Sequence, residues 1–203
     1  MKVGLKYPVV CAIAAIGSWQ VGVLAQSHQM QTMTSHHHSS GDDDRMNALV
    51  KIVRESTEPF RDVNAAEQAG YHLMFGCVSG GDFGAMGLHF VNGSLIGDDV
   101  LDPAHPEIVL YEPTADGRLR LTGADFLVLK DVWDAKHSDG PPQLMGQLLH
   151  LFDAPNRFGL PPFYTLHVWA WKDNPVGTFT NWNPKVSCDG FSGDPGGFFD
   201  QIP

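Results

Sequence analysis

Beyond Tyr71 the chain consists of short runs of β-branched and aromatic residues separated by Gly, Pro, Asn and Asp, and this pattern restricts the fold more than any other feature. Such runs are typical of β-strands, and the residues between them are typical of turns. Asp116-Gly117 favours a hairpin, and the proline pairs at 141–142 and 161–162 interrupt strand pairing. We expect a mainly antiparallel sheet or a partly closed barrel, with strands at 86–91, 108–112, 119–129, 143–152 and 163–172.

Two helices are expected before these strands. Asp44 is a suitable N-cap, and apolar residues follow it at helical spacing from Met46 to Val53. A second helix should begin near Pro59, because proline is favoured at the first helical position, and should end at Gly70. The predicted fold class is therefore α+β, with two N-terminal helices followed by the sheet.

Residues 1–25 have the three parts of a cleavable signal peptide. Lys2 and Lys6 give a positive start, an apolar stretch follows, and Ala25 ends a run of small or apolar residues suited to cleavage. A membrane anchor is the competing interpretation, but the apolar stretch is interrupted at 17–20. We expect a secreted or periplasmic protein with no stable membrane insertion after leader cleavage.

The composition and the segment after the leader limit the choice of partners. The chain has a formal net charge of −10, and loss of the two leader lysines makes it more negative, so nucleic acid is excluded as a partner. Residues 26–44 are polar and of low complexity, which predicts a disordered tether. Its histidines, at 28 and 36–38, could bind metal ions loosely, although a solvated linker is the simpler interpretation. Residues 45–203 should form a single domain.

Two cysteines, Cys77 and Cys188, remain after leader cleavage. A single pair of thiols far apart in sequence forms a disulfide most simply in an oxidising compartment. Neither cysteine has a Cys or His a few residues away, as a metal ligand would. We therefore predict a disulfide that ties the start of the domain to its C-terminal segment.

Four ionisable side chains lie on otherwise apolar faces of the expected strands: His89, Glu112, His150 and His167. An unsatisfied buried polar group costs about 1–3 kcal/mol, so each of them needs a partner. Convergence of His89, Glu112 and His167 would make a site with two histidines and one carboxylate, suited to Fe, Cu or Zn, and His150 could be a fourth ligand or support another ligand. The alternative is that each histidine is a hydrogen-bonded core residue.

Strand alternation also places Trp169 and Trp171 in a row with His167, where they could line a ligand pocket. The stretch 76–87 is too rich in glycine for a regular element, and its glycines would permit close backbone approach. The carboxylates of 97–102 could bind Ca²⁺, but their spacing differs from that of an EF-hand, and a solvated turn is the alternative. No G-x-S-x-G turn supports a serine hydrolase.

Four motifs give the chain a familiar pattern: MGLHFVN at 86–92, PEIVLYEP at 106–113, LHVWAWKDNPVG at 166–177 and NWNPKVSC at 181–188. Together they resemble a family of exported bacterial proteins of unassigned function. The resemblance covers roughly residues 58–188 and implies a shared fold, with nothing firm about activity.

Two functions from different classes are compatible with these patterns. The first is a metal-dependent enzyme that acts on a small aromatic or apolar molecule, with the histidines and Glu112 as ligands and the two tryptophans lining its pocket. The second is a non-catalytic ligand-binding or structural module whose histidines belong to the core.

Overall fold

The computed structural model describes residues 40–193. The expected leader and most of the expected tether lie outside these residues. The elements in chain order are α1 (Ser40–Thr57), the 3-10 helix η1 (Glu58–Arg61), α2 (Val63–Gln68), β1 (His72–Ser79), the 3-10 helix η2 (Gly81–Phe83), β2 (Ala85–Val91), β3 (Ile108–Pro113), β4 (Leu119–Leu129), α3 (Lys130–Asp134), β5 (Gln143–Leu144), β6 (Gln147–Leu148), β7 (His150–Phe152) and β8 (Phe163–Val168).

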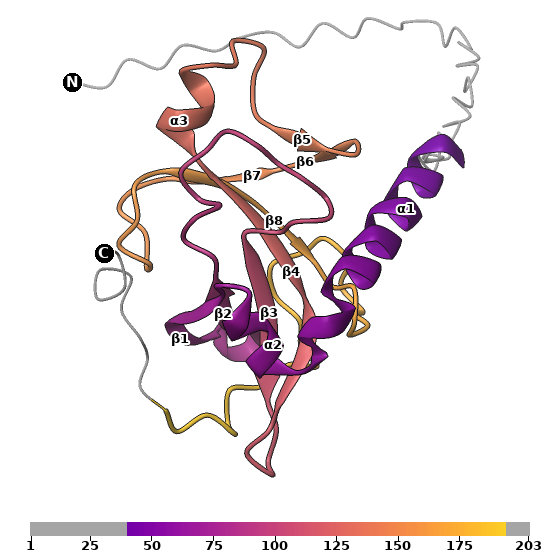
Figure 1. Ribbon diagram of the computed structural model, residues 1–203, viewed down its shortest axis with the longest axis vertical. Helices are drawn as coiled ribbons and strands as arrows, with labels where there is room; N and C mark the ends of the chain where they lie inside the picture. Colours follow the sequence, from indigo (N-terminus) through magenta and orange to yellow (C-terminus); the bar gives the residue numbers. More distant parts are fainter. Residues whose placement is uncertain (1–39, 194–203) are drawn as a thin grey trace, which may run out of the picture. The chain divides into compact units, whose positions relative to one another are not determined.

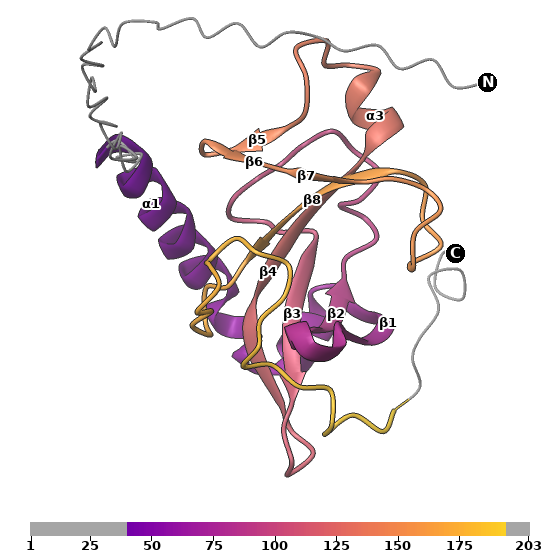
Figure 2. The same ribbon diagram turned by 180° about the vertical axis from the view of Figure 1, so that it is seen from behind.

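Six of the strands form one antiparallel sheet in the order β1-β2-β3-β4-β8-β7, which curves into a half-barrel (Figures 1 and 2). Strands β2, β3 and β4 pair in sequence order, as expected, and β1, which was not expected, pairs with β2. The expected strand at 143–152 is instead divided into β5, β6 and β7, and β5 pairs only with β6. The coarse prediction of mixed helices and an antiparallel sheet is confirmed.

One face of the sheet packs against the helices. Leu49 and Val53 of α1 are fully buried against alternate residues of β4 and β8, such as Phe126 and Leu166. Ala66 of α2 packs in a neighbouring cluster formed mainly by β2 and β3. Burial of this apolar stripe stabilises α1 more than its intrinsic helix propensity does.

The opposite, concave face contains the other set of alternating residues. A cluster on this face includes Val91, Ile108, Leu127 and Phe163. The loop between β7 and β8 contributes Leu160 to the same cluster. The ionisable residues discussed below lie on this concave face, so their environment is set by the half-barrel interior.

The helical region differs in detail from the expectation. The first helix, α1, begins at Ser40, before the expected start near Asp44. The second expected helix is interrupted at Asp62, whose side chain accepts a hydrogen bond from the Asn64 backbone N–H and caps α2. An N-cap aspartate satisfies a donor that the helix itself leaves unpaired, so a new helix begins where the 3-10 turn ends.

The first strand passes through sequence that was expected to be irregular. Strand β1 includes Gly76 and continues to Ser79, because a bulge accommodates the residues between Met74 and Cys77. Within the bulge, Phe75 has φ 66° and Gly76 has φ 63°. The expectation of no regular element over 76–87 was therefore wrong: a bulge absorbs the irregular backbone and pairing resumes beyond it.

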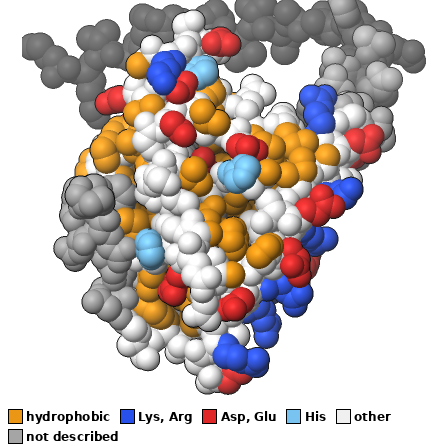
Figure 3. All heavy atoms as spheres, viewed as in Figure 1, with side chains coloured by type: hydrophobic (Ala, Val, Ile, Leu, Met, Phe, Trp, Pro, Cys, Tyr) orange, Lys and Arg blue, Asp and Glu red, His pale blue; other side chains and the backbone are white. Residues whose placement is uncertain are grey.

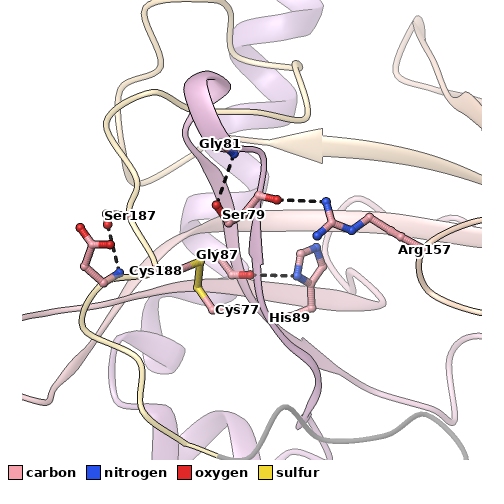
Figure 4. The surroundings of a disulfide bond; sticks show 9 residues. Cys77, Ser79, Gly81, Gly87, His89, Arg157, Ser187 and Cys188 are labelled. Atoms are coloured by element: carbon pink, nitrogen blue, oxygen red, sulfur yellow. Dashed lines mark hydrogen bonds between the residues drawn. A yellow bond between two sulfur atoms is a disulfide. The ribbon is translucent and has the colours of Figure 1, made fainter.

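The segment after β8 returns across the sheet and is bonded covalently to β1. Asn183 pairs with Ala85 through an isolated antiparallel bridge. Five residues later, Cys188 forms a disulfide with Cys77, with 5.7 Å between the Cα atoms and 111 residues between the cysteines in sequence (Figure 4). The predicted disulfide is confirmed.

On the face seen in Figure 3, Lys and Arg side chains lie mainly along the edge on the side of α1 and at the lower end, while apolar atoms occupy much of the centre. Across residues 40–193, no helix combines the length and apolar character required to cross a membrane.

Candidate metal centre

Three side chains from three strands meet inside the half-barrel: His89 of β2, Asp125 of β4 and His167 of β8. Strand register explains part of this arrangement, because Asp125 and His167 are direct cross-strand partners. His89 is separated from them by β3, and the curvature of the sheet brings its ring over the concave face. One possible ligand atom from each residue lies within 4.8 Å of the other two.

All three side chains are buried, with residue exposures of 3% for His89, 3% for Asp125 and 2% for His167. The imidazole rings of the two histidines are 5.8 Å apart between centroids and are oriented edge to face. Buried polar groups are normally fully hydrogen-bonded. The hydrogen bonds of each group therefore show which of its atoms remain available to a metal ion.

The hydrogen bond of His89 defines its tautomer. Its Nδ1 lies 3.2 Å from the carbonyl oxygen of Gly87. A carbonyl oxygen only accepts, so Nδ1 of the neutral ring carries the proton and donates it. The lone pair of Nε2 is then available to a metal ion. A backbone carbonyl that fixes the ring of a histidine in this way is typical of metal-binding histidines.

The ring of His167 is buried without a hydrogen bond to either of its nitrogens from the residues that the structure describes. Its Nδ1 is 3.4 Å from Oδ1 of Asp125, but the approach does not have hydrogen-bond geometry. Oδ1 of Asp125 instead accepts a hydrogen bond from the hydroxyl of Thr165. His167 therefore lacks the hydrogen-bond partners expected for a core residue, and this favours a metal ion as the partner of its ring.

Burial controls the charges of the three groups. Desolvation lowers the pKa of His89 to about 4, helped by the nearby ring of His167, and lowers the pKa of His167 to about 3, with a smaller contribution from His150. Desolvation raises the pKa of Asp125 to about 6, while the Thr165 hydrogen bond acts in the opposite direction. At neutral pH the centre therefore contains two neutral imidazoles and a carboxylate that is mostly ionised, which are the ligating forms of these groups.

The donor set fits a first-row divalent metal ion. Two histidines and one carboxylate are ligands for Zn²⁺ and Fe²⁺, and imidazole also suits copper. The possible ligand atoms of the three residues all lie within 4.8 Å of one another, so one ion could be shared by all three. A divalent ion would also compensate the buried charge of Asp125, which is costly without a partner.

An apolar cavity of about 20 Å³ adjoins the centre. Its walls include the rings of Phe75, Phe158 and Phe163. Phe75 is directed there by the β1 bulge, and Phe158 comes from the loop between β7 and β8. This volume admits about one water molecule. The cavity can hold an ion or a water but not an aromatic substrate, unless the wall opens.

No family model, curated protein or solved structure matches this chain.

Glu112 does not join the predicted histidine cluster. It lies at the end of β3, opposite Arg120, and its carboxylate forms ion pairs with Arg120, at 3.4 Å, and with Lys172. Cross-strand pairing supplies Arg120, and the segment after β8 supplies Lys172, to this buried acid, whose side chain is 8% exposed. Asp125 takes the place in the group that the sequence analysis gave to Glu112.

His150 lies beside the centre rather than within it. It is an exposed residue at the start of β7, paired in register with Thr165. Antiparallel partners point to the same face of a sheet, so His150 is directed towards the concave side and lies diagonally from His167. It remains a candidate supporting residue at the edge of the group.

The two tryptophans have different environments, because β8 ends at Val168 and the expected alternation does not continue beyond it. Trp169 is buried, its ring centroid is 6.2 Å from that of His167, and its indole N–H donates to the Thr180 carbonyl. Trp171 donates to the Thr57 hydroxyl and lies under the guanidinium of Arg61, near the helices. Neither side chain lines the cavity at the centre.

The acidic turn at 97–102 has partners within the protein. Asp99 pairs with Lys136 and His137, and Asp102 pairs with His105 at 2.8 Å. These contacts favour the alternative of a solvated turn over a Ca²⁺ site.

Sequence reasoning missed Asp125, although a signal was present. It is a single carboxylate in the centre of an apolar strand, between Ala124 and Phe126. The same argument that singled out Glu112, namely the cost of burying an unpaired charge, applies more strongly to Asp125.

Proposed function

We propose that this protein binds one first-row transition metal ion, Zn²⁺, Fe²⁺ or a copper ion, through His89, Asp125 and His167, and that it works as a metal-dependent enzyme outside the cytoplasm. The observation that carries the metal proposal is His167, whose two buried ring nitrogens have no hydrogen-bond partner among the described residues. An ion supplies that partner and compensates the charge of Asp125. Three protein ligands leave positions open, as catalytic metal sites require.

The ion would act as a Lewis acid or would lower the pKa of a coordinated water. The chain's own residues have separate roles. Gly87 orients His89 through its carbonyl, and the Thr165 hydroxyl fixes one oxygen of Asp125. The phenylalanines around the cavity exclude bulk water, which strengthens electrostatic interactions in the site. His150 lies at the edge of the group and is exposed to solvent.

Export forms part of the same proposal. The disulfide is consistent with an oxidising compartment, where such bonds persist. The expected signal peptide at 1–25 lies outside the described residues and supports a secreted or periplasmic location on sequence grounds alone.

The test is metal analysis of the chain in which the four tether histidines, at 28 and 36–38, are replaced by alanine, so that loose binding there does not contribute. We expect about one ion per chain, and a loss of affinity of at least about 100-fold in Asp125→Asn and His167→Ala. His105→Ala is the matched control, because His105 is exposed and distant in sequence from the three ligands. Equal metal content in Asp125→Asn and the parent chain, with circular dichroism unchanged, would overturn the proposal.

A non-catalytic structural role for the ion is the second candidate, and the small volume of the cavity favours it. In that case metal removal would lower the melting temperature, and no small molecule would gain access to the ion. Azide or cyanide added to the Co²⁺-substituted protein separates the two functions. A change in the visible spectrum indicates an open coordination position, whereas an unchanged spectrum indicates a closed structural site.

A further inference from the structure

A second hollow, larger than the cavity at the metal centre, lies between β7 and the segment after β8. This groove has a volume of about 390 Å³, within the range of small-molecule sites. Its walls include the side chains of Phe83, His150, Phe179, Asn181, Trp182 and Pro184.

The groove is predominantly apolar and aromatic. Phe83 is 70% exposed and Val176, also in the wall, is 65% exposed. Large apolar side chains gathered in one hollow are typical of binding sites, because their exposure to water costs free energy that a ligand recovers. Three aromatic rings in one wall favour a ligand that is itself a flat ring.

One polar atom in this wall defines the chemistry further. Oδ1 of Asn181 is buried and has no hydrogen-bond partner among the residues that the structure describes. A buried acceptor without a donor costs about 1–3 kcal/mol, and the cost is recovered when a ligand donates to it. The ring that fits this groove therefore carries a hydrogen-bond donor.

The groove and the cavity at the metal centre are lined by neighbouring residues. His150 lines the groove and is the cross-strand partner of Thr165, which lines the cavity and donates a hydrogen bond to Asp125. On the other side, the guanidinium of Arg157 lies 5.8 Å from the ring centroid of Trp182 and donates a hydrogen bond to the Ser79 carbonyl at 3.0 Å. Figure 4 shows Arg157 directed towards His89. These contacts place the groove beside the metal centre.

We propose that the groove binds a phenol, with its ring between Phe83 and Trp182 and its hydroxyl directed to Asn181, and that it holds this molecule beside the metal centre. Binding to the groove rests on the groove residues alone. The second part, the position beside a metal ion, rests on the proposed function above. The groove is also large enough for an aromatic molecule, whereas the cavity at the centre is too small for one.

The first experiment measures affinity for phenol and for toluene, which lacks the hydroxyl, by NMR titration of the full chain. Phe83→Ala should weaken binding of both probes about fivefold, because it removes a ring from the wall without disturbing the core. Asn181→Ala should weaken phenol binding about tenfold and leave toluene binding unchanged. The matched control is Val100→Ala, an exposed apolar residue outside the groove.

Unchanged phenol affinity in Phe83→Ala, or an equal loss in Val100→Ala, would overturn the groove assignment. Because Phe83 is exposed, its replacement should leave the fold intact, and this variant decides the question even where Asn181→Ala is unstable.

The second experiment places phenol relative to the ion. In the chain without tether histidines, Co²⁺ should shorten the relaxation times of the ring protons of bound phenol, whereas Zn²⁺ should not. If the chain binds phenol but not Co²⁺, the proposed metal site is contradicted and the proposed phenol groove is not. If phenol binds to the Co²⁺-loaded protein without enhanced relaxation, the proposed position of phenol beside the metal ion is contradicted.

Discussion

At the scale of single residues, the candidate centre depends on Gly87, which contributes a backbone carbonyl rather than a metal ligand. Gly87 has φ +92°, and a Cβ at this position would lie 2.4 Å from the carbonyl oxygen of Tyr111. Its own carbonyl accepts the hydrogen bond that fixes the tautomer of His89. Gly87 therefore has two roles. The absence of a Cβ permits close packing between β2 and β3, and the backbone carbonyl orients a metal ligand.

Gly87→Ala should destabilise the protein by about 2–4 kcal/mol, since alanine meets both an unfavourable φ and a backbone clash. Gly117→Ala is the control, because Gly117 has φ +77° but no atom within 4 Å of the added Cβ, so only the backbone cost of about 1 kcal/mol should remain. Urea denaturation of both variants measures the difference. Equal losses would show that the close approach to Tyr111 does not matter.

Glu107 is a second buried acid at this scale, outside the proposed ligand set. It is 2% exposed, and its Oε2 accepts a hydrogen bond from the Leu127 backbone N–H. Burial raises its pKa to about 8. The pKa of Glu107 is higher in the folded state than in the unfolded state. Its contribution to the free energy of unfolding is therefore fully present below about pH 4.5 and is lost as the pH rises through 8.

Glu107→Gln keeps the acceptor for Leu127 but cannot ionise. The variant should therefore become more stable relative to the parent chain as the pH rises from 5 to 9, and urea denaturation across this range measures the trend. The exposed Glu67→Gln serves as the control. A stability difference between Glu107→Gln and the parent that does not change with pH would contradict the protonated state of the acid.

At the scale of elements, the sequence predicted β2, β3 and β4 closely, because alternating apolar residues and turn signals bound each strand. Strand alternation also placed His89 and His167 correctly on apolar faces. It could not show that β1 passes through a glycine-rich bulge, or that β8 ends before Trp169, because both depend on contacts made by distant parts of the chain. Strand register, which places Asp125 opposite His167 and Glu112 opposite Arg120, decides which carboxylate joins the histidines, and neither strand shows this register by itself.

The separate environment of Glu112 gives a prediction for the end of β3. Glu112→Gln leaves Lys172 and Arg120 without their common partner and should destabilise the protein by about 2–4 kcal/mol. Its metal content should equal that of the parent chain, whereas Asp125→Asn should lose metal. Urea denaturation and elemental analysis of the two variants test this contrast. Loss of metal in Glu112→Gln with the fold intact would return Glu112 to the ligand set.

At the scale of the whole molecule, one covalent bond joins the first strand of the sheet to the last described segment. The disulfide closes a loop with a sequence separation of 111 residues. In the chain-entropy model a loop of this size stabilises the folded state by about 4–5 kcal/mol. The bond therefore fixes the C-terminal segment to β1, whose neighbour β2 carries His89 (Figure 4).

The double substitution Cys77→Ser and Cys188→Ser should therefore lower the free energy of unfolding by about 2–5 kcal/mol. Urea denaturation of the variant and of the oxidised parent measures the loss, and dithiothreitol should affect only the parent. A parent chain whose stability does not respond to dithiothreitol, with complete reduction verified by thiol titration, would contradict this role.

The position of β8 has a consequence for how the molecule assembles. Strands β1 to β4 pair in sequence order, whereas β8 reaches β4 only after the chain has passed through α3 and β5 to β7. Closing that long loop is the entropically costly step of folding and therefore a slow one. Strand β8 carries His167. A chain in which β8 has not yet paired with β4 therefore has only two of the three metal ligands. Capture of an ion would then favour the completed sheet by mass action, and metal uptake during refolding would report the moment at which β8 docks.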